Sequence, residues 1–234
     1  MRVTIHQPDH LGYLGFYHKI MNADKYVVLD NVQFSKGEFI NRNRIRGPKV
    51  PLWLSVPVLT KGRLGQLIRE VEINPKDPWQ KRHWGRIFHS YCKAPHYETY
   101  APVFQAIYAT SWEKLIDLNL HIIGTIFDLL GLEIDMCPAS ELGVTGKATE
   151  LLIAITQAVG GSTYLSGPAG KGYLDESLFE KSGIRLEYNQ FIHPIYEQLY
   201  EPFLPNMAVI DLLFNCGPRA KDILCSAGQS RSRE

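Results

Sequence analysis

Two hydrophobic periods alternate along this chain, one typical of strands and one typical of helices. Short apolar runs rich in β-branched residues, at residues 2–5 and 25–29, have the pattern of buried strands. Between them, the apolar positions of residues 14–23 recur with the helical period. A strand, a helix and a strand in close succession are the usual opening of a parallel sheet.

The middle of the chain departs from this alternation. Residues 38–75 contain strand-like segments separated by Gly-Pro and Lys-Gly turn signals, which predicts hairpins that extend the sheet. Residues 78–131 turn helical in period and end at a glycine, which predicts a helical insertion. Strand patterns then return near residues 134–137, 163–165 and 185–188.

Together these elements predict one Rossmann-like three-layer α/β domain over residues 1–225, with a mixed or mainly parallel sheet. The 38–75 segment is its expected β-hairpin extension, and the 78–131 segment is its expected helical insertion. Residues 226–234 are mostly small and polar, and we expect a flexible tail there.

Composition narrows the classes of function. With 234 residues, of which 45% are hydrophobic and 21% charged, the chain is large enough for a full core. Its net charge of +1 argues against binding nucleic acid or an anionic membrane by bulk electrostatics, and it has no apolar run of about 18 residues. Four cysteines without a C-x-x-C pair predict reduced thiols in a cytoplasmic protein and no metal site.

A polar cluster follows the first predicted strand, beginning at His6 and Gln7. Histidine can relay a proton, and the glycines at 12 and 15 would let an anion approach the backbone at the next helix. Asp30 ends the second predicted strand. Because open α/β sheets bind ligands at the carboxyl ends of their strands, these residues predict a site. The alternative is that His6 and Gln7 only satisfy a buried turn.

A second cluster runs from Asn41 to Arg46. In an extended conformation, Arg42, Arg44 and Arg46 would share one face, and Asn41 and Asn43 would share the other. Guanidinium groups on one face suit phosphate or carboxylate, whereas asparagines suit a polar ligand such as a sugar. The alternative is a solvated edge strand protected by basic residues.

A third cluster follows the strand predicted at residues 163–165. Ser166, three nearby glycines and Lys171 could present backbone amides and one cation to phosphates, although their order does not match a P-loop. A glycine-rich turn with a surface lysine is the alternative. His193 adds a further polar group nearer the C-terminus.

A set of motifs in fixed order resembles the WbqC-like protein family over about residues 3–218. The motifs are His6-Gln7-Pro8, Leu14-Gly15-Phe16, Leu29-Asp30, Val32-Gln33-Phe34, Asn41-Arg42-Asn43-Arg44-Ile45, Trp53-Leu54-Ser55-Val56-Pro57-Val58, Tyr164-Leu165-Ser166-Gly167 and Asp211-Leu212-Leu213-Phe214-Asn215. The resemblance implies a setting in bacterial O-antigen or related lipopolysaccharide biosynthesis, with transfer of glycine or another acyl group to an amino sugar. Asn31 departs from the family pattern, in which a second aspartate commonly follows Asp30.

A weaker likeness concerns cofactors. The order of elements is similar to that of adenylate-forming enzymes of the nucleotidyltransferase superfamily, which makes ATP a candidate cofactor. Their His-x-Gly-His motif is not intact here, because Phe16 occupies the position of the motif's final histidine.

The leading hypothesis is an amide-forming acyltransferase or ligase that acts on a nucleotide-linked amino sugar. His6 would transfer the proton, Asp30 would orient it or act as the base, and all the site residues would share one cavity. The residues assigned to substrate binding are Gln7, Gln33, Asn41, Arg42, Asn43, Arg44, Ser166, Lys171 and His193.

Two other classes stay open at this point. One is a non-catalytic protein that binds a sugar nucleotide or glycan. The other is a thiol-dependent acyltransferase that uses Cys92 or Cys216. A homo-oligomer is a further candidate state of the protein.

Overall fold

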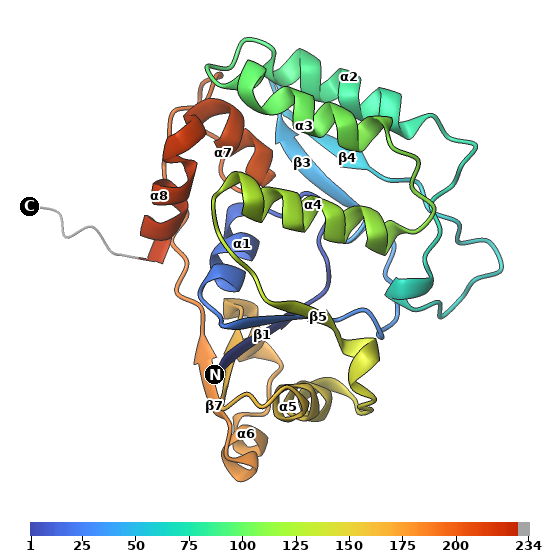
Figure 1. Ribbon diagram of the computed structural model, residues 1–234, viewed down its shortest axis with the longest axis vertical. Helices are drawn as coiled ribbons and strands as arrows, with labels where there is room; N and C mark the ends of the chain where they lie inside the picture. The colour runs from blue at the N-terminus through green and yellow to red at the C-terminus, as the bar shows by residue number, and fades with distance from the viewer. Residues whose placement is uncertain (229–234) are drawn as a thin grey trace, which may run out of the picture.

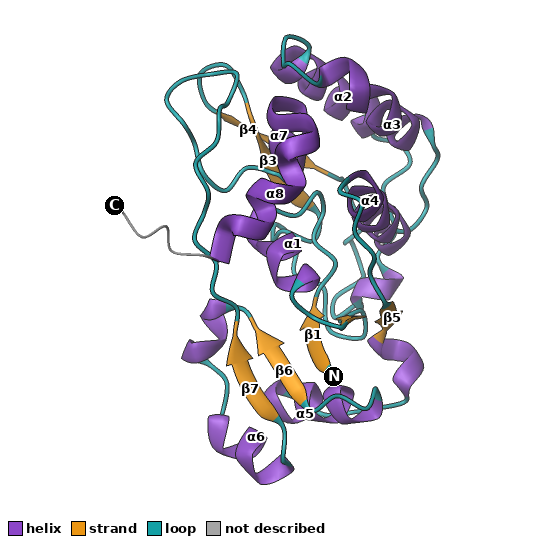
Figure 2. Ribbon diagram, turned by 60° about the vertical axis from the view of Figure 1, so that its left-hand side comes forward, coloured by secondary structure: helices purple, strands orange, loops and turns teal. Residues whose placement is uncertain are grey.

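The computed structural model describes residues 1–228, and its centre is a parallel sheet. The strands are β1 (Arg2–His6), β2 (Lys25–Val28), β5 (Met136–Pro138), β6 (Thr163–Ser166) and β7 (Arg185–Tyr188). Their spatial order is β5-β2-β1-β6-β7, and every pair in this sheet is parallel. Figure 2 shows β1, β6 and β7 pointing the same way. The α/β prediction is confirmed.

Helices cover both faces of the sheet because its central strand buries side chains on both. Val3 and Ile5 pack on one face with Leu151. His6 points to the opposite face, where its ring meets that of Phe16 with centroids 5.3 Å apart. The covering helices, seen above and below the sheet in Figure 1, are α1 (Leu14–Met21) on the His6 side, and α5 (Ala148–Ala158) and α6 (Glu176–Ser182) on the other side.

The expected hairpin is present as a two-stranded antiparallel ribbon of its own, β3 (Arg42–Arg46) and β4 (Pro51–Ser55). The inner face of this ribbon, which includes Ile45 and Leu54, belongs to the same core as α1. The helices around it are α2 (Trp79–Tyr91), α3 (Tyr97–Ala109), α4 (Leu115–Leu129), α7 (Val209–Cys216) and α8 (Ala220–Cys225). Residues 68–70, within a segment expected to be a strand, form a 3-10 turn.

A buried carboxylate ties the helical half of the molecule together. Asp211 on α7 accepts hydrogen bonds of 2.8 Å from the hydroxyls of Tyr91 and Tyr196 and from the amide of Gln198. The Tyr91 hydroxyl also accepts the backbone N–H of Arg46 at 2.9 Å. Asp211 therefore links α7 to α2, to the ribbon and to the 196–198 segment.

Most of the expected tail lies outside the described residues. Its first three residues, Ser226–Gly228, form a 3-10 turn in which Ala227 is buried. No helix in residues 1–228 is long and apolar enough to cross a membrane.

Candidate functional site

The chain reverses direction across the sheet between β1 and β6. From β1 it proceeds outward through β2 to β5, and it then returns to the other side of β1 with β6 and β7. Loops that leave the carboxyl ends of two such strands diverge, and the crevice between them is the usual ligand site of an open α/β sheet. Here those loops follow His6 and Ser166.

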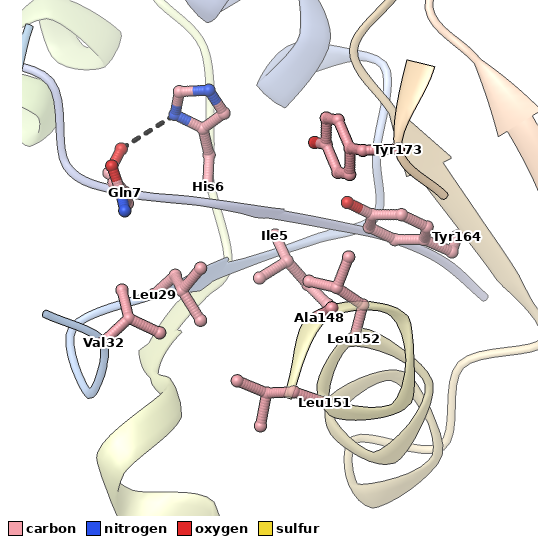
Figure 3. A pocket seen from close by; sticks show the side chains of 10 residues that line it. All are labelled: Ile5, His6, Gln7, Leu29, Val32, Ala148, Leu151, Leu152, Tyr164 and Tyr173. Atoms are coloured by element: carbon pink, nitrogen blue, oxygen red, sulfur yellow. Dashed lines mark hydrogen bonds between the residues drawn. The ribbon is translucent and has the colours of Figure 1, made fainter. Parts of the chain in front are cut away.

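A cavity of about 340 Å³ lies at this point. Figure 3 shows His6 on one side of β1, Ile5 and Leu152 on the other, and two tyrosine rings beside the strand. The cavity is lined by Ile5, His6, Gln7, Leu29, Val32, Ala148, Leu151, Leu152, Tyr164 and Tyr173. The cavity combines an apolar floor with an imidazole and polar groups near its rim, as ligand pockets commonly do.

The hydrogen bond of His6 fixes its tautomer. Nδ1 lies 2.9 Å from the backbone oxygen of Gln7, and a carbonyl oxygen can only accept, so Nδ1 carries the hydrogen. Nε2 then holds a free lone pair. Burial, together with the positive charge of Lys19, lowers the pKa of His6 to about 3, although the Gln7 carbonyl acts in the opposite direction. His6 is therefore a neutral imidazole at neutral pH.

Two backbone segments border the same cavity. The loop after β6 ends at Tyr173, which lines the cavity. A Cβ at position 170 of this loop would clash with the Ser166 hydroxyl, so only glycine fits there. The helix α5 begins at the lining residue Ala148, and no side chain caps its first turn. Ser166 itself donates to the backbone oxygen of Gly167 at 3.0 Å. Lys171 lies 5.3 Å above the ring of Tyr188.

Asp30 is not placed to orient His6. Its carboxylate accepts hydrogen bonds from the backbone N–H and hydroxyl of Ser140, at 2.9 and 2.6 Å. The Nδ1 hydrogen of His6 goes to Gln7 instead. Asp30 lines a separate hollow of about 330 Å³, together with Arg69 and others. The expectation that Asp30 orients His6 is therefore wrong.

The two asparagines are committed to backbone partners. Asn41 donates to the oxygen of Val56 at 3.1 Å and accepts from the N–H of Gly37 at 3.0 Å. Asn43 donates to the oxygens of His10 and Leu11, at 3.2 and 2.9 Å. Both side chains are buried. Asn43 holds the loop after β1 against the ribbon, whereas Asn41 joins the turn before β3 to the segment after β4.

Of the three arginines in the predicted cluster, only Arg42 and Arg44 are accessible enough to contact a ligand, because Arg46 is buried. Arg42 and Arg44 lie over the ring of Trp53, at 4.3 and 5.6 Å from its centroid, and the described residues offer them no carboxylate. Arg46 is buried and donates to the backbone oxygens of Gly47 and Pro202.

The ribbon separates these arginines from His6. Successive residues of β3 face opposite sides, and Asn43 contacts the loop that follows His6. Arg42 and Arg44 consequently point away from that loop, and neither lines the His6 cavity. The expectation of one shared cavity is wrong for this part of the predicted site.

Two further predicted residues lie outside the cavity. His193 uses both ring nitrogens, because Nδ1 bonds to the oxygen of Pro194 at 2.8 Å and Nε2 accepts the N–H of Asn206 at 3.0 Å. Gln33 is exposed, and its backbone forms an isolated bridge with Leu67.

Sequence reasoning assigned no role to Asp9 or Lys19, which are both buried, and the charge of Lys19 acts on His6. The structure shows what the sequence did not, because every residue of Leu14–Ile20 is buried and Lys19 is a charged residue within that enclosed helix segment.

The fold and site define a parallel α/β protein with a ligand crevice at its strand reversal. A model of the WbqC-like protein family matches residues 7–223, and the chain belongs to this family. It is 31% identical over 225 residues to the uncharacterized protein Rv1507c of Mycobacterium tuberculosis, covering 95% of this chain and 97% of that protein. No solved structure matches it.

Proposed function

We propose that this protein is an amide-forming transferase that moves an acyl or glycine-type aminoacyl group to a nucleotide-linked amino sugar in bacterial O-antigen or related biosynthesis. The observation that carries the proposal is the free Nε2 lone pair of His6 at the rim of the cavity. Membership of the WbqC-like family fits the same biosynthetic setting.

The reaction needs one proton acceptor. The amine nitrogen attacks the carbonyl carbon of an activated acyl group, a C–N bond forms, and the carbonyl electron pair moves to oxygen. When the carbonyl reforms, the leaving group departs with its electron pair, and the positively charged nitrogen gives its proton to Nε2 of His6. An imidazole of low pKa is a weak base, and it suits this step because the charged adduct is itself acidic.

Backbone amides and nearby cations would stabilise the negative charges. The uncapped N–H groups of the first turn of α5 suit the developing oxyanion, because the helix begins at the cavity wall. The loop after β6, with Lys171, suits the diphosphate of the sugar nucleotide. ATP is the proposed activating co-substrate where the acyl donor is a free acid.

The test is a mass assay with a matched variant. The wild-type protein is incubated with amino-sugar nucleotides, amino acids and ATP, and it is expected to add the mass of one acyl group to the sugar. His6→Asn keeps an N–H close to the position of Nδ1 but has nothing at Nε2, so turnover should fall about 100-fold or more. An unchanged rate in a correctly folded His6→Asn protein would remove His6 from the mechanism.

One observation favours a second candidate, a non-catalytic protein that binds a sugar nucleotide or glycan. The exposed Trp53 ring lies under Arg42 and Arg44, apart from the His6 cavity, and an aromatic ring beside two guanidinium groups suits a ligand that stacks and carries a negative charge. A rise in melting temperature with a sugar nucleotide, without any product, supports this candidate over the transferase.

A further inference from the structure

A second cavity, the edge cavity, lies at the β7 side of the parallel sheet and has a volume of about 320 Å³. The helix α1 supplies His18 and Asn22 to its walls, the strands β6 and β7 supply Leu165 and Glu187, and the C-terminal turn supplies Gly228. Figure 1 shows α1 and α8 side by side above this part of the sheet. The edge cavity shares no lining residue with the candidate active site, and it is large enough for a small ligand.

Two of the polar side chains that line the edge cavity are almost completely buried. His18 is 4% exposed and Asn189 is 6% exposed. The amide oxygen of Asn189 lies 3.1 Å from Nδ1 of His18, so Nδ1 carries the hydrogen of this bond. The bond joins α1 to the segment after β7 and fixes both side chains.

Each side chain of this pair keeps one unused hydrogen-bonding group. Because Nδ1 is protonated, Nε2 of His18 holds a lone pair. The amide nitrogen of Asn22 lies 3.5 and 3.4 Å from the two ring nitrogens, and these nearly equal distances place it over the ring face, out of line with the lone pair. The amide nitrogen of Asn189 donates to no group in residues 1–228, and it is not one of their closed-off polar atoms. Buried polar groups normally have partners, so both atoms are suited to a ligand.

Gly228 keeps space open beside the imidazole. A Cβ at this position would lie 3.2 Å from Nε2 of His18 and 2.9 Å from the backbone oxygen of Gln190. A side chain there would occupy the place next to the lone pair. Its absence leaves that place to the edge cavity, where an atom of a bound molecule can reach Nε2.

The edge cavity has no uncompensated charge in its lining. The charged lining residues in the described part of the chain are Arg2 and Glu187, whose side chains form an ion pair of 2.9 Å. Burial lowers the pKa of His18 below its usual 6.5, against the effect of its hydrogen bond with Asn189, so the imidazole is neutral at neutral pH. A phosphate, carboxylate or ammonium ligand would lack a counter-charge here, whereas a neutral polar ligand needs none.

Hydroxyl groups match the two unused atoms. The lone pair of His18 needs a donor and the amide of Asn189 needs an acceptor, and a hydroxyl can serve as either. The exposed side chain of Gln190 adds a further donor and acceptor at the rim. Leu165 and the ring of Tyr188 offer a small apolar wall, which suits the C–H groups of a sugar ring.

We infer that the edge cavity binds a neutral sugar unit of about hexose size. One hydroxyl donates to Nε2 of His18, and the same or a neighbouring hydroxyl accepts from the amide nitrogen of Asn189. The inference goes beyond the proposed function, since this site needs neither a catalytic base nor a nucleotide.

Saturation-transfer NMR on the full chain tests the inference with glucose, galactose and N-acetylglucosamine as probes. At least one of these neutral sugars should bind saturably. Their charged relatives glucosamine and glucuronate should bind about 10-fold more weakly, because each would bring an uncompensated charge into the edge cavity. Tighter binding of a charged relative would overturn the assignment to neutral ligands.

Two variants locate the bound sugar. His18→Asn keeps an N–H close to the position of Nδ1 but has nothing at Nε2, so it should weaken sugar binding about 10-fold. Gln190→Trp changes an exposed rim residue, so it should block the cavity without a loss of stability. The control His121→Asn is exposed and outside the edge cavity, and it should bind sugar normally.

Cys225 provides a second readout of occupancy. Its exposed side chain lines the edge cavity, whereas Cys92 does not line it. Saturating sugar should slow the alkylation of Cys225 by iodoacetamide and leave that of Cys92 unchanged. Wild-type protein that binds no neutral sugar, or sugar binding that persists in both folded variants, would overturn the site.

Discussion

At the residue scale, a single hydrogen bond distinguishes the two ring nitrogens of His6. Because the Gln7 carbonyl can only accept, the lone pair must reside on Nε2.

Two other histidines are also buried and neutral. Burial lowers the pKa of His10 to about 4 and that of His83 to about 3, and His83 donates through Nε2 to the oxygen of Ser55 at 3.0 Å.

These pKa values predict a loss of stability in mild acid. The pKa of folded His83 lies below its usual 6.5, so between about pH 3 and 6.5 the unfolded chain binds the extra proton. The free energy of unfolding should therefore decrease as pH falls through 6.5. His83→Gln retains an N–H donor and should reduce the difference in unfolding free energy between pH 7 and pH 5 by about 2 kcal/mol.

Urea titrations at the two pH values check this result. The exposed His121→Gln variant is the matched control. The same pH difference in His83→Gln as in the wild type would contradict a neutral buried imidazole at position 83.

At the element scale, α7 is held by a carboxylate that serves several elements at once. Tyr91 on α2 both donates to Asp211 and accepts from the backbone of Arg46. Tyr108 on α3 is buried as well, but its hydroxyl has no partner in the described part of the chain. The two tyrosines therefore form a natural comparison of satisfied and unsatisfied hydroxyls.

Tyr91→Phe should cost about 2–3 kcal/mol of unfolding free energy, because a buried carboxylate loses a donor and a buried N–H loses its acceptor. Tyr108→Phe should be neutral or slightly stabilising, because it removes an unpaired buried hydroxyl. Chemical denaturation measures both. Equal losses in the two variants would show that the Asp211 network adds nothing beyond packing.

At the scale of the whole molecule, sequence patterns predicted the parts of the fold that depend on local periodicity. The alternation that ends at His6 placed this residue at a strand terminus, and the glycine-rich loop after Ser166 was likewise placed after a strand. Both loops border the reversal point of the sheet, where a ligand crevice is expected.

Periodicity could not predict which polar residues are committed to tertiary partners. Alternation correctly placed Asn43 opposite the arginines, but only the folded chain shows that its amide is committed to the backbone of the His10 loop. Arg46 was grouped with the half-buried Arg42 and Arg44, although it is fully buried and donates to the backbone oxygen of Gly47.

The central claim is that His6 presents an unprotonated Nε2 to the substrate, and imidazole ¹⁵N NMR tests it most directly. With the His6 signals assigned by their loss in His6→Asn, Nε2 should have the shift of an unprotonated nitrogen from pH 7 to pH 5. It should move when an amino-sugar nucleotide is added. A protonated His6 at pH 7, or a His6 signal that saturating ligand leaves unchanged, would contradict the account.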